Sequence, residues 1–111
     1  MPMHRFPILM ALVATASLAP AAHALDAAAA VELAKANGCY SCHANGEKVV
    51  GPAFAAIAAK YAGDKDAAAS LAQSIQNGSK GKWGRIPMPP HASLSAGDLK
   101  TLSVWVLTVK P

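Results

Sequence analysis

The stretch NGCYSCHANG, residues 37–46, contains both cysteines of this 111-residue chain, and a histidine follows the second cysteine directly. Two thiols three positions apart suit a redox disulfide, half of a zinc site or the covalent attachment of a c-type haem. Each of these chemistries makes different demands on the remainder of the chain. The other segments of the sequence therefore decide between them.

The first 24 residues have the three parts of a secretory signal peptide. Arg5 gives a positive start, residues 8–19 are apolar or small, and Ala22 and Ala24 are placed as the small residues of an A-x-A cleavage site. The apolar run is too short to cross a bilayer comfortably. We expect cleavage after Ala24, with an uncleaved membrane anchor as the alternative. Residues 25–111 would then form a single soluble domain in the periplasm.

The mature segment has few large apolar side chains, because alanine makes up much of its apolar content. A chain this short also buries a small fraction of its surface and usually needs an additional stabilising element. One disulfide that closes a very small loop would contribute little core volume. A haem, which is a large flat apolar body, would fill the centre.

Four segments have the pattern of helices, and none has the pattern of a strand. The first opens at Asp26, a favourable N-cap, and stops at an Asn-Gly pair. Ser95 and Asp98 form the pattern of a capping box before the last one. The predicted helical segments are residues 26–38, 53–63, 64–78 and 94–110. The sequence therefore predicts a small all-α domain with one glycine- and proline-rich loop over residues 78–92.

The surroundings of the two cysteines favour haem. A thioredoxin-like dithiol follows a strand, and an iron–sulfur cluster needs four thiolates. A structural zinc site needs four ligands, which Cys39, Cys42, His43 and His91 could just supply. On one helical turn, two such sulfurs reach the two vinyl positions along one porphyrin edge, and the adjacent imidazole points at the iron. A haem-free disulfide remains the main alternative.

Met88 is the only methionine after the signal segment, and it lies between Pro87 and Pro89. Methionine usually fills gaps in a core. Prolines restrict the backbone on both sides of Met88, so its thioether loses little further conformational entropy when it is fixed. We expect this sulfur to complete the coordination of the iron, with simple packing of a turn as the alternative.

Four quoted segments carry a resemblance to a known family. In chain order they are GCYSCHA (38–44), VVGPAF (49–54), IQNGSKGKWGRIPMPP (75–90) and LKTLSVWVL (99–107). Together they resemble a class I cytochrome c of the small bacterial c-551 or c8 group, and the similarity spans residues 33–110. The resemblance implies the class I cytochrome c fold, with about four short helices packed around one covalently attached haem c.

The resemblance also assigns roles at the haem. Cys39 and Cys42 would carry the thioether bonds, His43 would be the proximal iron ligand and Met88 the distal ligand. Pro52 matches the proline whose carbonyl oxygen accepts a hydrogen bond from the other imidazole nitrogen.

At the propionate end of the haem, Trp83 matches the tryptophan whose indole N–H reaches a haem propionate. Close relatives often carry an arginine near that propionate, where this chain has Ser74. Arg85 is one candidate for replacing the charge; otherwise the propionate titrates at a higher pH. His91 stands where relatives tend to have an asparagine.

The resemblance implies an electron carrier and not an enzyme, since outer-sphere electron transfer needs neither a substrate pocket nor a general base. The exchange surface would be an apolar patch at the haem edge with a cationic rim. Its candidate apolar residues are Val49, Val50, Ile86 and Pro89, and its candidate cations are Lys48, Lys80, Lys82 and Arg85. The alternatives are a haem-based peroxidase or gas sensor whose sixth site opens, and a haem-free thiol redox or metal-binding protein.

The charge balance bears on the partners. Outside the signal segment the chain has nine Lys and Arg residues against six Asp and Glu residues. A positive excess favours acidic partner surfaces. We expect a monomer that receives electrons from a cytochrome bc1-type donor and passes them to a terminal oxidase, nitrite reductase, peroxidase or photosynthetic centre. Nucleic acid is not an expected partner of a secreted chain.

Overall fold

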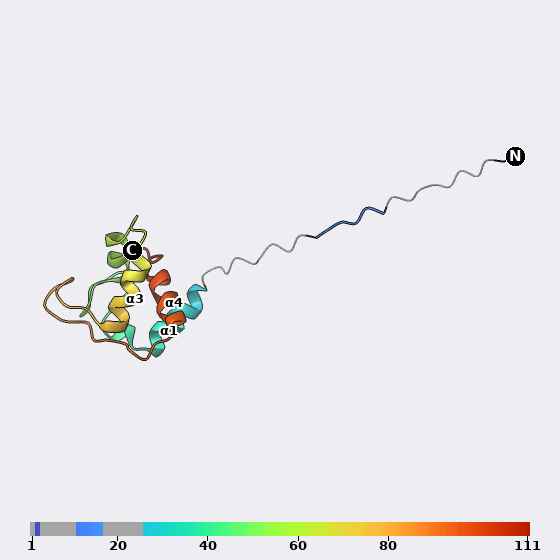
Figure 1. Ribbon diagram of the computed structural model, residues 1–111. Helices are drawn as coiled ribbons and strands as arrows, with labels where there is room; N and C mark the ends of the chain where they lie inside the picture. Colours follow the sequence, from blue (N-terminus) through green and yellow to red (C-terminus); the bar gives the residue numbers. More distant parts are fainter. Residues whose placement is uncertain (1, 3–10, 17–25) are drawn as a thin grey trace.

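The computed structural model describes residues 2, 11–16 and 26–111 (Figure 1). Residues 11–16 are exposed and form no regular element. The predicted cleavage site at Ala24 and most of the predicted signal peptide lie outside the described residues, so the signal peptide stays a prediction. In the described part of the chain, no helix is long and apolar enough to cross a membrane.

From residue 26 onward the domain is helical, as predicted. Its elements are α1 (Ala27–Ala36), the 3-10 turn η1 (Cys39–Ser41), α2 (Phe54–Lys60), α3 (Ala67–Asn77) and α4 (Ala96–Val106). Each α-helix lies within one of the predicted segments. Over residues 26–111 the structure contains two isolated β-bridges and no strand. The all-α prediction is therefore confirmed.

Side-chain caps explain where two of the helices begin. Asp26 Oδ1 accepts a hydrogen bond from the backbone N–H of Ala29 at 3.1 Å, and Ser95 Oγ accepts one from the N–H of Asp98 at 3.1 Å. Each bond satisfies a donor that has no partner within its helix. The predicted capping box is only half formed, because among the described residues the Asp98 carboxylate accepts no hydrogen bond from the Ser95 N–H.

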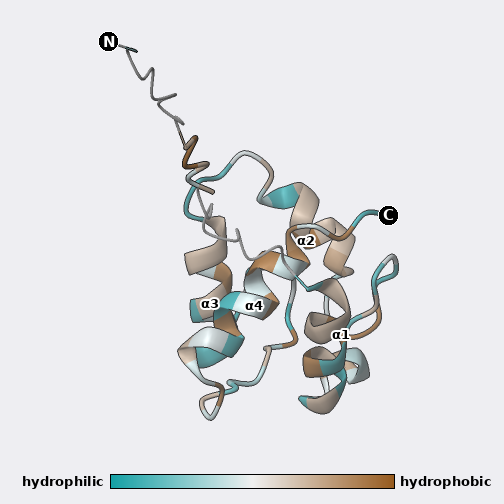
Figure 2. Cartoon of the chain, turned by 90° about the vertical axis from the view of Figure 1, so that its right-hand side faces the viewer, coloured by the Kyte–Doolittle hydropathy of each residue, from teal (hydrophilic) through white to brown (hydrophobic). Residues whose placement is uncertain are grey.

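Helix α4 is the centre of the packing and lies between α3 and α1 (Figure 2). Ala30 and Ala34 of α1 and Ser103 of α4 are completely buried. Small side chains at these positions let the two helices approach closely. Phe54 packs edge-on against Trp105, with the ring centroids 5.2 Å apart. Alanines make up a large part of the buried core, as the composition predicted.

The loop between α3 and α4 is tied to the helices by backbone hydrogen bonds. Ser79 and Met88 exchange two of them, Ser79 N to Met88 O at 3.1 Å and Met88 N to Ser79 O at 2.8 Å. The N–H of His91 donates to the carbonyl of Ile75 at 2.8 Å. These hydrogen bonds hold the loop in one conformation next to the helices.

Candidate functional site

An open cavity of about 170 Å³ lies between α3, α4, the η1 segment and the loop after α3. Its walls are largely apolar, with Phe54, Ile57, Leu71, Leu102 and Val106 among them. All six of the predicted cofactor-binding residues line this one cavity: Cys39, Cys42, His43, Pro52, Trp83 and Met88.

The imidazole of His43 is held on two sides. Its Nδ1 lies 2.7 Å from the carbonyl oxygen of Pro52. A carbonyl oxygen can only accept, so Nδ1 carries the proton and Nε2 keeps its lone pair. The ring also stacks on Phe54, with centroids 5.0 Å apart and planes 17° apart. His43 is therefore a buried imidazole whose Nδ1 is bound to Pro52, which leaves Nε2 as the nitrogen that can bind a metal.

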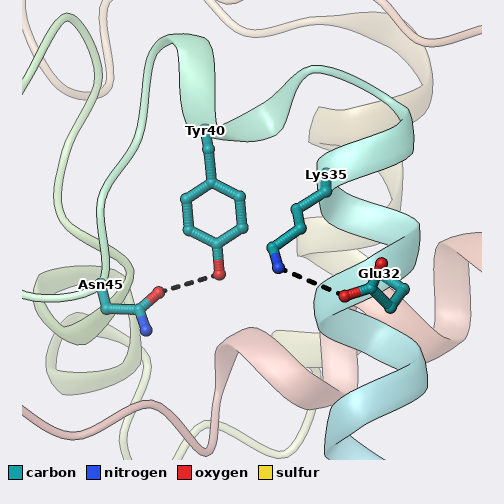
Figure 3. A network of polar contacts seen from close by, with 4 residues as sticks. All are labelled: Glu32, Lys35, Tyr40 and Asn45. Atoms are coloured by element: carbon teal, nitrogen blue, oxygen red, sulfur yellow. Dashed lines mark hydrogen bonds and ion pairs between the residues drawn. The ribbon is translucent and has the colours of Figure 1, made fainter.

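The backbone around the cysteines explains this placement. The N–H of Gly51 donates to the carbonyl of Cys42 at 2.7 Å, and the N–H of Phe54 donates to the carbonyl of Ala44 at 2.9 Å. These bonds fold residues 44–54 back onto the Cys-x-x-Cys-His segment. The hydroxyl of Tyr40 also donates to Asn45 Oδ1 at 3.1 Å (Figure 3). The segment is therefore braced on both sides of Cys42.

The neighbouring ion pair in the same view contributes less. Lys35 Nζ lies 3.2 Å from a carboxylate oxygen of Glu32 on α1 (Figure 3). Both side chains are well exposed, and surface pairs of this kind stabilise a fold by only ~0–1 kcal/mol. The brace at Tyr40 and the turn at Gly51 position the site, and this pair does not.

Both cysteines are free thiols and half-buried. Burial raises the pKa of the Cys39 thiol, because a thiolate loses hydration there. Redox-active dithiols instead have a lowered thiol pKa. Among the described residues, no group of three or more His, Cys, Asp or Glu side chains comes together in a way that could hold a metal ion. The environment of the cysteines thus favours covalent attachment over dithiol or zinc chemistry.

Met88 lines the cavity from the loop. Its backbone is fixed by the paired bonds with Ser79, and the loop starts at Gly78, whose φ is +79°. A Cβ on Gly78 would lie only 2.7 Å from the carbonyl oxygen of Met88. Glycine is required here for its backbone conformation and for close approach to the loop.

The mouth of the cavity holds Trp83, whose exposed fraction is 36 %. Lys60 Nζ stands 4.4 Å from the centroid of its ring, a cation–π contact. Across residues 26–111 the indole N–H of Trp83 has no hydrogen-bond partner. That donor is available to a ligand.

Beside Trp83, the ammonium of Lys82 lies 3.4 Å from Ser74 Oγ, and both residues line the cavity. Arg85 is not one of the lining residues. Neither lysine contact could be predicted from the sequence, since each joins a residue of the loop after α3 to a residue on a helix. His91 also lines the cavity.

Comparison with known proteins decides the family. A sequence model of the family described as "Cytochrome c" matches residues 27–110. The chain belongs to the cytochrome c family. It is 54% identical over 84 residues to cytochrome c-552 of Nitrosomonas europaea, covering 76% of this chain and 82% of that protein. It is likewise 54% identical over 78 residues to cytochrome c-551 of Pseudomonas aeruginosa, covering 70% and 74%.

Solved structures agree with this assignment. The crystal structure of wild-type Nitrosomonas europaea cytochrome c552 superposes with a TM-score of 0.70 at 54% identity, covering 72% of this chain and 99% of that one. The class 1 cytochrome MtoD from Sideroxydans lithotrophicus ES-1 superposes with a TM-score of 0.70 at 30% identity, covering 79% and 100%. The predicted membership of the class I c-551 group and the predicted fold are confirmed.

This cytochrome c binds one covalently attached haem c. The residues of the cavity fit that group. Two free thiols and an imidazole with an available Nε2 come from one short segment, and a thioether comes from the loop. The remaining walls are mostly apolar, as a porphyrin face requires, and the mouth carries two polar donors, the Trp83 indole N–H and the Lys82 ammonium.

Proposed function

We propose that this cytochrome c is a periplasmic single-electron carrier whose haem iron has His43 and Met88 as its two axial ligands. The observation that carries the proposal is the hydrogen bond from His43 Nδ1 to Pro52. It leaves Nε2 as a free ligand atom in the cavity that also receives the thioether of Met88. Cys39 and Cys42 would hold the haem through two thioether bonds.

The bound haem supplies an iron that gains or loses one electron. The chain's part is to keep both ligands still while the charge changes. The hydrogen bond to Pro52 orients the His43 ring and raises its basicity. The paired backbone bonds to Ser79 hold Met88, and its neutral sulfur favours ferrous iron and so raises the reduction potential. Because neither ligand has to move, little rearrangement opposes electron transfer.

The periplasmic assignment rests on the signal-peptide pattern of residues 1–24, with its positive start, apolar run and A-x-A end. Haem attachment to a Cys-x-x-Cys-His segment is compatible with that compartment. The proposal therefore places the mature protein, residues 25–111, outside the cytoplasm.

We also propose that the protein acts as a monomer on redox partners with acidic docking surfaces. Three apolar side chains are strongly exposed near the site: Val49 at 54 %, Val50 at 42 % and Ile86 at 66 %. Lys48, Lys80 and Arg85 are exposed close to them in the chain. Such a surface suits membrane-bound or periplasmic donors and acceptors of the bc1, oxidase, nitrite reductase or peroxidase kind. Positive charge would steer the encounter.

The test is the visible spectrum of the protein expressed with its own leader in a host that attaches haem. We expect recovery in the periplasmic fraction, sharp ferrous bands that survive acid–acetone extraction, and the ferric band of an iron–sulfur bond. The ferric protein should not bind cyanide at first, nor the ferrous protein carbon monoxide. Rapid binding of cyanide or carbon monoxide would favour a peroxidase or gas sensor. If no haem resists acid–acetone extraction, a thiol protein would be favoured.

A further inference from the structure

We propose that Lys82 provides the positive charge that binds a haem propionate, and that it does so in place of a cation at position 74. The inference rests on the proposed attachment of the haem at Cys39 and Cys42. It assigns a binding role to a side chain that the sequence motifs leave on the outer rim. The structure carries it through three observations: a contact, a charge imbalance and a loop conformation.

The contact is the one between Lys82 and Ser74. Lys82 Nζ lies 3.4 Å from Ser74 Oγ, and both residues line the cavity beside Trp83. Ser74 lies on α3, eight residues earlier in the chain. Lys82 thus reaches across to α3 and brings its ammonium to the place where a longer side chain at position 74 would end. Arg85, the other cation near Trp83, does not line the cavity.

The charge imbalance follows from the lining residues. None of the described residues that line the cavity is acidic. The only ion pair in the described part of the chain joins Lys35 to Glu32 on α1. Lys82 therefore has a neutral hydroxyl as its only protein partner at the cavity, and a carboxylate brought by the ligand would complete the pair. Haem carries two such carboxylates.

The loop conformation places the two donors together. Gly81 and Gly84 have φ angles of +75° and +124°, and they flank Lys82 and Trp83. These positive angles, which glycine adopts without strain, turn the chain so that both neighbouring side chains line the cavity. The ring of Trp83 is held by Lys60 at 4.4 Å, and its N–H has no partner within residues 26–111. An ammonium and an indole N–H thus stand side by side, which suits a carboxylate.

The predicted effect is on propionate ionisation. A cation close to a carboxylate favours its charged form, so the propionate should ionise at a lower pH with Lys82 present. Ionisation of a propionate near the iron should make the reduction potential of the haem depend on pH over the window in which the propionate titrates. The titratable side chains that line the cavity are Cys39, Cys42, His43, Tyr61, Lys82 and His91, and Lys60 stands behind Trp83. Lys82 is the only lysine or arginine among the residues that line the cavity.

The experiment is a spectroelectrochemical titration of the holoprotein from about pH 4 to pH 9. In Lys82→Gln the pH-dependent window should move upward by about one pH unit, a tenfold change in proton affinity. Lys82→Arg should restore it. Lys80→Gln and Arg85→Gln remove the same charge from the same loop outside the cavity, and they should move the window by no more than a few tenths of a unit.

A lysine placed at position 74 gives a second test of the inference that does not depend on the Lys82→Gln variant alone. Ser74→Lys in the Lys82→Gln background should return the window towards its original pH, because positions 74 and 82 reach the same point. Ser74→Lys alone should lower it further. If Lys82→Gln moves the window no more than Lys80→Gln, the inference is wrong, and the propionate titrates without a protein cation.

This failure is distinguishable from failure of the proposed function. A wild-type protein with extraction-resistant haem and the iron–sulfur band, but with no special effect at Lys82, would overturn only the inference. A wild-type protein without covalent haem or without that band would overturn the proposed function before any variant is compared.

Discussion

Nδ1 of His43 lies 2.7 Å from the carbonyl oxygen of Pro52, and this bond determines which imidazole nitrogen keeps a lone pair. A Cβ on the neighbouring Gly51 would lie 2.6 Å from Cε1 of this ring, 3.0 Å from Nδ1 and 3.1 Å from Nε2. The imidazole is therefore contacted by the carbonyl oxygen of Pro52 and by the backbone of Gly51, where there is no room for a side chain. Residues 51 and 52 act together on the same ring.

Gly51→Ala should displace that ring. The new methyl group would force the imidazole away from Pro52 and lengthen the hydrogen bond, so we expect a free energy of unfolding lower by about 1–3 kcal/mol. A weaker bond at Nδ1 makes the imidazole less basic and should raise the reduction potential. Guanidinium unfolding and potentiometry measure the two effects. Gly46→Ala is the control, because a Cβ there has no heavy atom within 4 Å; equal effects at both sites would contradict the steric account.

Gly78→Ala should disturb the distal side. Gly78 and Gly63 have nearly the same backbone angle, φ +79° and +78°. Alanine is strained at either positive φ, and at Gly78 the ψ angle of 174° adds to this strain. Only at Gly78 would the Cβ lie 2.7 Å from Met88 O, whereas nothing lies within 4 Å at Gly63. We expect Gly78→Ala to weaken the ferric iron–sulfur band and Gly63→Ala to leave it intact. Loss of the band in both variants would show a general destabilisation instead.

The helices could be predicted because their signals are local. Asp26 and Ser95 cap their helices as their positions in the sequence indicate. The six residues predicted to bind the cofactor line one cavity, and each of them belongs to a short motif with fixed spacing. Lys82 could not be placed, because a rim lysine and a cavity lysine have the same sequence signal. Its side chain is directed to Ser74 by a loop whose path depends on tertiary packing.

The contact between Lys60 and Trp83 could not be predicted from the sequence either, because it also depends on the path of the loop. The two residues are 23 positions apart and meet only once the loop after α3 folds back towards α2. Arg85 was a plausible charge partner for the propionate on sequence distance from Trp83, but it does not line the cavity. Sequence spacing predicts contacts within one element and seldom between a loop and a distant helix.

Ser103→Ala should stabilise the protein. Ser103 of α4 is fully buried, and its hydroxyl has no hydrogen-bond partner among the described residues. A buried hydroxyl without a partner costs about 1–3 kcal/mol, and alanine removes it with little loss of volume. We expect a gain of about 1 kcal/mol in thermal or guanidinium unfolding. Ser95→Ala on the same helix removes the N-cap and should lower stability by about 1 kcal/mol. A loss in both variants would mean that the Ser103 hydroxyl is bonded in solution.

Replacing Lys48 and Lys80 with glutamine should slow electron delivery. Both lysines are exposed and flank the apolar residues proposed for docking. Removing two steering charges should reduce the second-order rate roughly two- to tenfold at low salt. The difference should shrink as salt rises, because charges are screened beyond roughly 8 Å at physiological ionic strength. Stopped-flow measurement with the physiological partner checks this, with Lys100→Gln on α4 as the control. A salt-independent loss, or an equal loss in the control, would place docking elsewhere.

Met88→Ala should open the sixth coordination position of the iron. The variant loses a ligand that prefers ferrous iron, so the iron–sulfur band should vanish. The potential should fall by on the order of 0.1 V, given that axial ligands tune haem potentials over about 0.8 V. The ferric protein should become mostly high-spin and peroxide-reactive. A retained band would overturn the distal assignment, since no other methionine follows the signal segment.

His91 determines how complete that opening is. It lines the cavity, but its backbone N–H is bound to the carbonyl of Ile75 at 2.8 Å, and Pro89 and Pro90 stiffen the chain before it. We therefore expect only a minor low-spin fraction with two nitrogen ligands in Met88→Ala. Adding His91→Ala should remove that fraction and leave the high-spin form. If the double variant keeps it, the sixth ligand comes from a lysine, which spectra of the corresponding lysine-to-glutamine variants would identify.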